Sequence, residues 1–296
     1  MDLGTPLHSF AFQAIGTHWV IDIYSASENL VFSELHAAIA QRIEEFDAVY
    51  SRFRSDSLVA RMSARSGEYA LPDDAQKLFD IYQRLYTLTQ GSFTPLIGNT
   101  LEQAGYDPHY SLISTELTRP LSWEKVLQYE FPKLIVIEPA MLDFGAAGKG
   151  YLVDIVSDLI QSFGIVHFCV DAGGDMVYKS ADRASLTVAL EDPGNTSQAI
   201  GTIAIHNQAL CASSGNRRAW GAYTHIIDPR TLESPKTIAA TWVTASTALV
   251  ADALATCLFL EESTLFTAHF QFEYLILYTD YSIAKSPGFA AELFVA

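Results

Sequence analysis

Positive charge is scarce in this sequence. The 296 residues include 18 Lys and Arg against 34 Asp and Glu, which gives a formal net charge of −16 at pH 7. A field of this sign repels long polyanions, so nucleic acid is not expected as a partner. A small anionic ligand remains compatible with the composition if a metal ion, backbone N–H groups or a few placed Lys and Arg side chains bind it locally.

Cysteine is also rare. Cys169, Cys211 and Cys257 stand far apart within apolar stretches, without a Cys-x-x-Cys or Cys/His cluster. Their spacing argues against a zinc site and against a disulfide framework. We therefore expect three buried thiols that behave as small hydrophobic side chains.

Long hydrophobic runs are missing as well. No stretch approaches the roughly 18 apolar residues of a membrane helix, and residues 1–12 lack the basic and apolar segments of a signal peptide. The sequence as written predicts a cytoplasmic protein without a membrane span. An exported lipoprotein whose N-terminal signal had been removed would look the same.

What the sequence does contain is a dense hydrophobic pattern, with 49% hydrophobic residues. Apolar residues at three- and four-residue spacing predict helices, while β-branched and aromatic runs predict strands, the first two joined as a hairpin. The segment 91–107, rich in Gly, Pro and Asn, predicts an ordered loop. The helices are expected at residues 30–50, 73–89, 151–163 and 248–260. The strands are expected at residues 9–12, 18–24, 134–137, 141–144, 166–170, 185–190, 200–206, 209–213, 224–227, 241–245, 274–278 and 282–284.

Strands and helices alternate irregularly in this prediction, with several hairpin-like pairs and no internal repeat. The pattern is typical of the α+β class, with a mixed, mostly antiparallel sheet and packed helices. No composition shift marks a linker, so we expect a single domain over residues 1–296.

A glycine-rich run at residues 145–150 enters the helix predicted at 151–163. Free N–H groups at such a turn bind anions, and Lys149 is placed to meet a phosphate or a carboxylate. The run does not fit the nucleotide-binding loop, because only two residues separate Gly145 from Gly148-Lys149. Tight packing between strand and helix is an equal alternative.

Asp252 and Thr256 lie four residues apart in an otherwise apolar predicted helix, so they share one face. A carboxylate and a hydroxyl suit Mg²⁺ or Ca²⁺, which prefer oxygen ligands. In the alternative, Thr256 bonds to a helix carbonyl while Asp252 caps a helix or pairs with an Arg.

Between these two motifs lies His225-Ile226-Ile227-Asp228-Pro229. If this segment is a strand that Pro229 closes, His225 and Asp228 face opposite sides. His225 is then a candidate proton-transfer group or nucleophile, with a hydrogen-bonded core histidine as the alternative. Upstream, Arg217 and Arg218 suit phosphate contacts or surface ion pairs equally well.

Taken in order, these segments resemble the FAD:protein FMN transferase family, also called the ApbE family. Each motif alone is modest, but the ordered set is specific and covers nearly the whole chain. Residues 50–53 with 56–57, 89–98 and 172–175 are similar to further family segments. The motifs are Ala14-Ile15-Gly16-Thr17, Leu142-Asp143-Phe144-Gly145-Ala146-Ala147-Gly148-Lys149-Gly150-Tyr151, His225-Ile226-Ile227-Asp228-Pro229-Arg230-Thr231 and Ala251-Asp252-Ala253-Leu254-Ala255-Thr256.

The resemblance implies a Mg²⁺-dependent enzyme that cleaves the pyrophosphate of FAD, its substrate. It would move FMN onto a threonine of an acceptor flavoprotein and release AMP. The resemblance also assigns residues. Metal ligands would be Asp252, Thr256 and the main-chain carbonyl of Gly148, and the catalytic residues would be His225 and Asp252. The FAD-binding residues would be Ile15, Phe53, Ser92, Phe93, Thr94, Asp143, Lys149, His225 and Ile226.

Four positions depart from the family pattern. Phe53 replaces a Tyr, Leu58 a Glu, Ser63 a frequent Asn and Thr94 an Asp. Two alternative functions therefore stay open. One is a Mg²⁺-dependent FAD pyrophosphatase that gives FMN to water, and the other is a flavin-binding protein without turnover.

Overall fold

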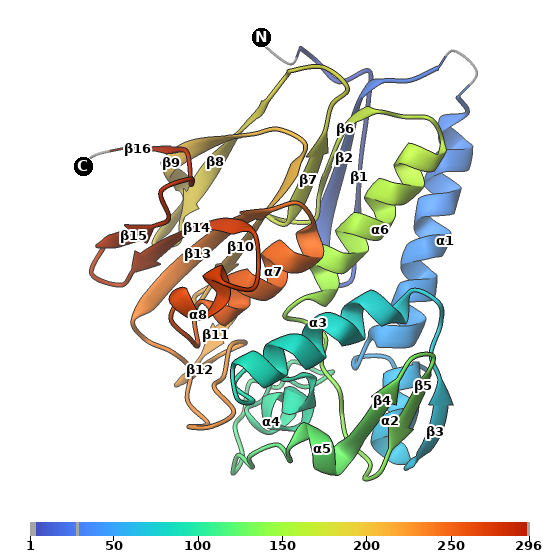
Figure 1. The fold of residues 1–296 in the computed structure, drawn as a ribbon, viewed down its shortest axis with the longest axis vertical. Helices are drawn as coiled ribbons and strands as arrows, with labels where there is room; N and C mark the ends of the chain where they lie inside the picture. Colours follow the sequence, from blue (N-terminus) through green and yellow to red (C-terminus); the bar gives the residue numbers. More distant parts are fainter. Residues whose placement is uncertain (1–3, 28–29, 295–296) are drawn as a thin grey trace.

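An eight-stranded antiparallel sheet forms the centre of the computed structural model, which describes residues 4–27 and 30–294 (Figure 1). Neighbouring strands follow the order β1-β2-β6-β7-β10-β13-β14-β15. Their bounds are β1 (His8–Ala14), β2 (Thr17–Ser25), β6 (His167–Asp171), β7 (Met176–Lys179), β10 (Gln208–Ser214), β13 (Ile238–Ala245), β14 (Phe272–Tyr278) and β15 (Ile283–Lys285).

Three helices pack over one face of this sheet, and their apolar stripes fill the main core. The three are α1 (Phe32–Tyr50), α6 (Gly148–Ser162) and α7 (Ala248–Cys257). The other face is covered by a three-stranded sheet with strand order β16-β9-β8 and a separate hydrophobic cluster. Those strands are β8 (Leu186–Asp192), β9 (Asn195–Ile205) and β16 (Ala291–Leu293).

A third group of elements lies at the lower end of Figure 1. It contains the small sheet β3-β5-β4 and several short helices. Two-residue strands β11 (Ala219–Trp220) and β12 (Tyr223–Thr224) and helix α8 (Thr264–Thr267) complete the described chain. The group consists of α2 (Leu58–Ala64), β3 (Gly67–Ala70), α3 (Ala75–Leu88), η1 (Pro95–Ile97), α4 (Gly98–Gln103), α5 (Trp123–Val126), β4 (Leu127–Glu130) and β5 (Lys133–Val136).

Most of the expected elements are present, and the α+β class is confirmed. The predicted helices correspond to α1, α3, α6 and α7, and the expected hairpin is β1–β2, closed by Ile15 and Gly16. Both turn residues have positive φ, 43° and 74°, as a two-residue hairpin turn requires.

Three expectations are wrong. Residues 141–144 form no strand, because β5 already pairs with β3 on one side and β4 on the other. Residues 95–103 are helical rather than a loop, since Thr94 Oγ1 accepts the Leu96 N–H and Pro95 begins η1. The strand expected at residues 224–227 ends at Thr224, whose hydroxyl bonds to the N–H and the carbonyl of Ile226.

The three cysteines are free and buried, as expected. Cys257 is the last residue of α7 and Cys211 contacts that helix, both within the main core, whereas Cys169 lies in the cluster on the opposite face of the sheet. Among the helices of the described residues, none has the length and apolar character needed to cross a membrane.

Candidate functional site

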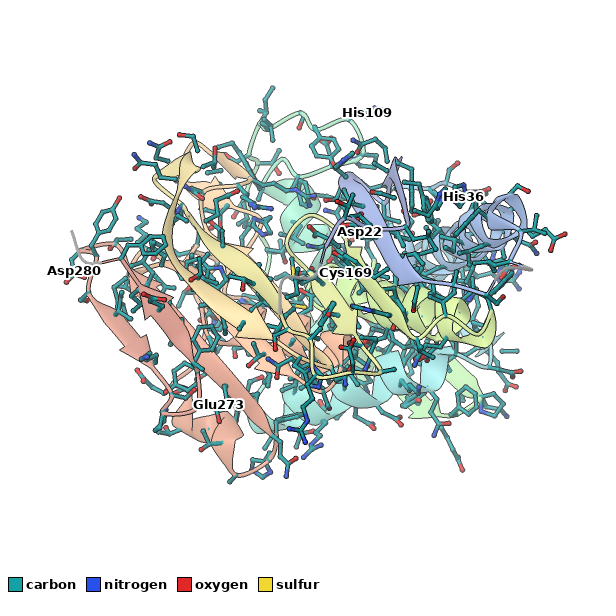
Figure 2. The ribbon with its side chains drawn as sticks, turned by 90° about the horizontal axis from the view of Figure 1, so that it is seen from above. Asp22, His36, His109, Cys169, Glu273 and Asp280 are labelled. Carbon is teal, nitrogen blue, oxygen red and sulfur yellow. The ribbon has the colours of Figure 1, made fainter. Side chains whose placement is uncertain are left out.

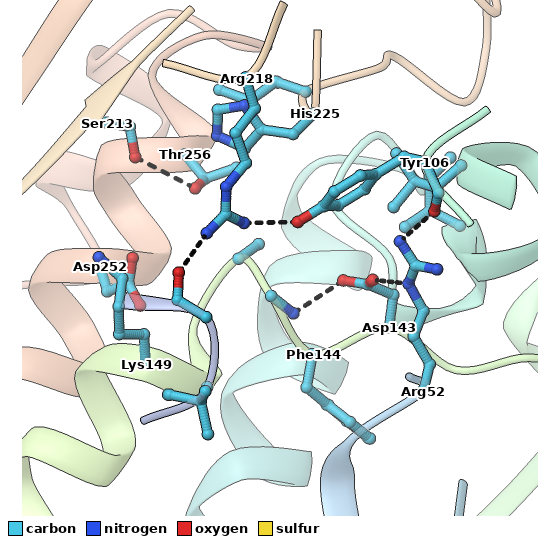
Figure 3. A pocket seen from close by; sticks show the side chains of 18 of the residues that line it. Arg52, Tyr106, Asp143, Phe144, Lys149, Ser213, Arg218, His225, Asp252 and Thr256 are labelled. Carbon is cyan, nitrogen blue, oxygen red and sulfur yellow. Dashed lines mark hydrogen bonds and ion pairs between the residues drawn. The ribbon is translucent and has the colours of Figure 1, made fainter. Parts of the chain in front are cut away.

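A cavity of about 530 Å³ opens where the first turn of α6, the middle of α7 and the β1–β2 turn meet (Figure 3). Every residue that the family resemblance assigned to FAD or metal lies on its wall. Their roles as ligands stay predictions, but the structure brings them together. They are Ile15, Phe53, Ser92, Phe93, Thr94, Asp143, Gly148, Lys149, His225, Ile226, Asp252 and Thr256.

The glycine-rich run brings α6 against α7. A Cβ on Gly150 would lie 2.2 Å from the Ala248 carbonyl oxygen and 2.6 Å from Asp252 Cβ. The Gly150 N–H donates to Asp252 Oδ2 at 2.8 Å. Tight packing and a polar role thus coexist in this run, because Gly150 makes the contact while Lys149 directs its ammonium group toward carboxylates.

Lys149 pairs with Asp175, whose side chain is fully buried. Burial opposes the lysine charge, but the carboxylates of Asp175 and Asp252 outweigh burial and raise the pKa of Lys149. Burial and the nearby Asp175 raise the pKa of Asp252 well above its usual range, although Lys149 acts in the opposite direction. Two buried carboxylates therefore share one ammonium group, and the site favours a further cation.

Asp252 and Thr256 line the cavity from the same face of α7, as their spacing predicted. Asp252 caps one N–H of α6 but forms no ion pair with an Arg in the described chain. Thr256 Oγ1 lies 3.5 Å from Ser213 Oγ and does not bond back to a carbonyl of its own helix. Within the described residues Asp252 Oδ1 accepts no hydrogen bond, which leaves oxygen donors available at the cavity.

His225 stands across the cavity on the segment that follows β12. Its Nδ1 is buried and has no hydrogen-bond partner among the described residues. Burial, together with the positive charges of Arg218 and Lys149, lowers the pKa of His225 to about 4. The imidazole is therefore neutral at pH 7, with one of its two ring nitrogens unprotonated. This differs from a hydrogen-bonded core histidine.

The far end of the cavity contains an arginine that the sequence analysis did not select. Arg52 is 4% exposed and donates from Nε to Asp143 and from Nη2 to the Tyr106 carbonyl at 2.7 Å. Its guanidinium lies 4.1 Å from the ring centre of Phe53, which stacks on Tyr110 at 5.8 Å. These aromatic rings form a flat apolar wall. The position of Arg52 beside Phe53 in a family segment was the available signal.

Arg217 and Arg218 have different partners. Arg217 pairs with Glu191 at 3.0 Å, near the surface. Arg218 donates to the Tyr106 hydroxyl and to the Gly16 carbonyl, so it spans the cavity between two walls. Sequence spacing could not separate these two arginines.

Asp228 is not on the cavity wall. It pairs with Arg230 at 2.7 Å and its N–H donates to the Glu233 carbonyl, which shapes the turn around Pro229. His225 and Asp228 thus lie on different sides of the segment, although the strand on which that expectation rested ends at Thr224.

The positions that depart from the family pattern are locally satisfied. Leu58 is buried in the core at the start of α2, and Ser63 Oγ donates to the Ala60 carbonyl. Thr94 and Phe53 remain on the cavity wall. Phe53 and Thr94 therefore change the chemistry of the wall, whereas Leu58 and Ser63 lie outside it.

Fold and cavity together define an α+β protein with a deep pocket, charged at one end and aromatic at the other. The model of the ApbE family matches residues 15–271, and the chain belongs to that family.

Curated relatives are similar over most of this chain. A FAD:protein FMN transferase of Vibrio cholerae is 26% identical over 213 residues, which cover 67% of this chain and 64% of that relative. One of Treponema pallidum is 26% identical over 286 residues, covering 85% of this chain and 78% of the relative.

Solved structures have the same fold. The flavin transferase ApbE from Vibrio cholerae has a TM-score of 0.79 at 22% identity, covering 96% of this chain and 99% of that chain. The ApbE protein from Thermotoga maritima has a TM-score of 0.83 at 21% identity, covering 95% of this chain and 97% of that one.

Proposed function

We propose that this protein transfers FMN from FAD to a threonine of an acceptor flavoprotein, with Mg²⁺ and with release of AMP. The observation that carries the proposal is the cavity itself. In a member of the ApbE family, Lys149, His225, Asp252 and Thr256 meet at one end and an aromatic wall stands at the other. Relatives named FAD:protein FMN transferase support the same reaction.

FAD suits this cavity by size and by chemistry. A volume of about 530 Å³ lies in the range of small-molecule sites. The rings of Phe53 and Tyr110 offer a stacking surface for a planar heterocycle. Arg218 and Lys149 supply positive charge for the pyrophosphate within a protein of net charge −16.

Mg²⁺ fits the donor set at the charged end. The residues that would hold it are Asp252, Thr256 and the carbonyl of Gly148, all oxygen donors on the cavity wall. The shortage of positive charge around buried Asp252 and Asp175 supports a cation there. When bound, the ion neutralises the pyrophosphate and stabilises charge that develops on the transferred phosphoryl group.

The reaction exchanges one P–O bond for another. The threonine hydroxyl oxygen forms a bond to the FMN phosphorus, and the bond from that phosphorus to the bridging oxygen breaks. The bonding electron pair stays with AMP. The negative charge of the bound pyrophosphate raises the low pKa of His225, which then accepts the hydroxyl proton at its unprotonated ring nitrogen, and Lys149 orients the phosphates. Placement and electrostatics supply most of the rate enhancement in such transfers.

The test combines FAD, Mg²⁺ and an acceptor domain with its threonine. We expect covalent flavin on the acceptor together with AMP, and no covalent flavin on a Thr→Val acceptor. Asp252→Asn should reduce the rate at least roughly 100-fold, the usual scale for a lost electrostatic contact in the transition state. Asp280→Asn is the matched control, because Asp280 is exposed and outside the cavity.

Two results would contradict the proposal. Free FMN and AMP without covalent flavin would instead indicate the pyrophosphatase. FAD binding without any AMP would indicate a flavin-binding protein without turnover. Unchanged metal-dependent turnover in Asp252→Asn would refute the assignment of Asp252.

A further inference from the structure

The two edges of the main sheet differ in how they are protected. At one edge β15 is three residues long and includes Lys285. At the other edge β1 is seven residues long and has the sequence His-Ser-Phe-Ala-Phe-Gln-Ala, without Pro, Lys or an acidic residue. Exposed edges normally carry such residues because a bare edge pairs with other chains. The β1 edge is therefore available for pairing.

The hairpin geometry identifies the free backbone groups of β1. In a two-residue hairpin the pair next to the turn, here Ala14 and Thr17, is hydrogen bonded, and hydrogen-bonded pairs alternate along the ladder. By that alternation Ser9, Ala11 and Gln13 direct their N–H and C=O groups away from β2. Outside the hairpin, no described residue hydrogen-bonds to these backbone groups.

Next to this edge lies a groove of about 500 Å³ between β1 and α1. Its floor includes the half-buried rings of Phe10 and Phe12 and the side chain of Ile39. The imidazole of His36 packs on Phe10 with a centroid distance of 3.7 Å. Figure 2 shows His36 on α1, beside the sheet edge. The groove can therefore accept apolar side chains that alternate along an extended chain.

The inner end of the groove joins the catalytic cavity. Ile15 and Asp47 line both the groove and the cavity. Glu44 and Asp47 lie 2.5 and 3.3 Å from Arg54 Nη1, so the acidic groups at this junction are compensated. A chain that follows β1 toward Ile15 would thus reach the cavity without crossing an uncompensated charge.

We propose that the β1 edge and this groove bind an extended segment of the acceptor flavoprotein. The segment adds a strand beside Ser9, Ala11 and Gln13, places alternate apolar side chains in the groove, and delivers its threonine into the cavity at Ile15. This inference rests on the proposed function. Backbone pairing supplies affinity and the groove supplies side-chain selection, as in other strand additions.

Two substitutions outside the catalytic cavity test the docking. Ala11→Pro removes an edge N–H, while Ala11→Ser keeps it. Ala40→Trp places a large ring on the α1 wall of the groove, while Ala37→Trp places the same ring on an exposed position of α1 outside it. For Ala11→Pro and Ala40→Trp we expect the KM for the acceptor to rise roughly tenfold, the scale of one lost contact of this kind. FAD affinity should remain unchanged, and both controls should behave as wild type.

The outcomes separate this inference from the proposed function. If wild type forms covalent flavin and both test variants keep the wild-type KM, strand docking is refuted and the transferase proposal stands. If wild type forms no covalent flavin, that measurement refutes the transferase proposal and the inference built on it. Sedimentation adds a further check, because a dimer that Ala11→Pro converts to monomer would assign the edge to a second copy and refute acceptor docking.

Discussion

At the scale of single residues, the site contains more buried carboxylates than ammonium groups to pair with them. Lys149 faces two carboxylates, Asp175 and Asp252, and their combined field keeps it protonated. Replacing Lys149 leaves two uncompensated buried carboxylates, which is costlier than removing a matched pair. The imbalance also explains why a cation suits the position.

His225 leads to a prediction about pH. Its folded-state pKa is about 4, below the ordinary value of 6.5, so the unfolded chain binds the proton first as pH falls. The stabilising contribution of neutral His225 is fully present above about pH 6.5 and is lost as the pH falls toward 4. We expect the Tm of wild type to fall more between pH 7.5 and pH 5 than that of His225→Gln. Equal falls in thermal unfolding experiments would contradict a neutral, desolvated His225.

At the scale of elements, the contact between α6 and α7 positions the side chains that are proposed to bind Mg²⁺. Gly150 permits the approach, and Asp154 of α6 accepts the N–H groups of Ala248 and Leu249 at 2.8 Å each, which caps α7. The two helices are thereby fixed to each other at the turn that carries Gly148 and at the start of the helix that carries Asp252. This arrangement preorganises the charged end of the cavity.

Gly150→Ala tests this contact. The added Cβ would meet the Ala248 carbonyl at 2.2 Å, so the helices must separate, and we expect a loss of ~1–3 kcal/mol in the free energy of unfolding. Gly148→Ala is the matched control in the same turn, because its nearest atom, Phe144 Cβ, is 3.5 Å away. Denaturant titration measures the free energy of unfolding of both variants. Similar changes in the two variants would show that the close contact of Gly150 with α7 does not set the effect, since backbone propensity alone favours Ala at both positions.

The spacing of apolar residues predicted the elements whose burial is regular. It failed where a side-chain hydrogen bond ends an element or where no neighbouring strand has a free edge for pairing. The apolar spacing of α1 and the hairpin turn at Gly16 are local signals. Residues 141–144 have a strand-like composition, but β5 has no free edge to pair with them. The end of β12 at Thr224 depends on a hydroxyl contact that composition does not reveal.

The site residues also divide into those that local spacing predicts and those that depend on contacts between distant segments. Asp252 and Thr256 share a helix face, so their meeting could be predicted from spacing. The contact of Arg52 with Asp143, and the different partners of Arg217 and Arg218, depend on residues distant in the chain. Ordered family motifs identified many residues of the cavity wall, while tertiary contacts decided which partners its arginines have.

At the scale of the whole molecule, the cavity joins helices and loops from distant parts of the chain, so ligand binding should stabilise the fold. A ligand that binds only the folded state stabilises it by ~2.7 kcal/mol at 100 times its dissociation constant. We expect Mg²⁺ together with FAD to raise Tm by several degrees in wild type, an effect that a chelator reverses. In Asp252→Asn, the part of the rise in Tm that is due to Mg²⁺ should be lost. A chelator-insensitive shift in wild type would contradict a metal site at Asp252.

The positions of the three buried thiols allow chemical labelling to report local opening of the structure. Cys257 ends α7 and Cys211 lies beneath that helix, whereas Cys169 is enclosed on the opposite side of the sheet. Burial raises the pKa of all three, so a labelling reagent reaches them only when the structure opens. Bound Mg²⁺ and FAD should slow labelling of Cys257 more than that of Cys169. The ratio of those two labelling rates then measures how often α7 detaches while the sheet stays closed.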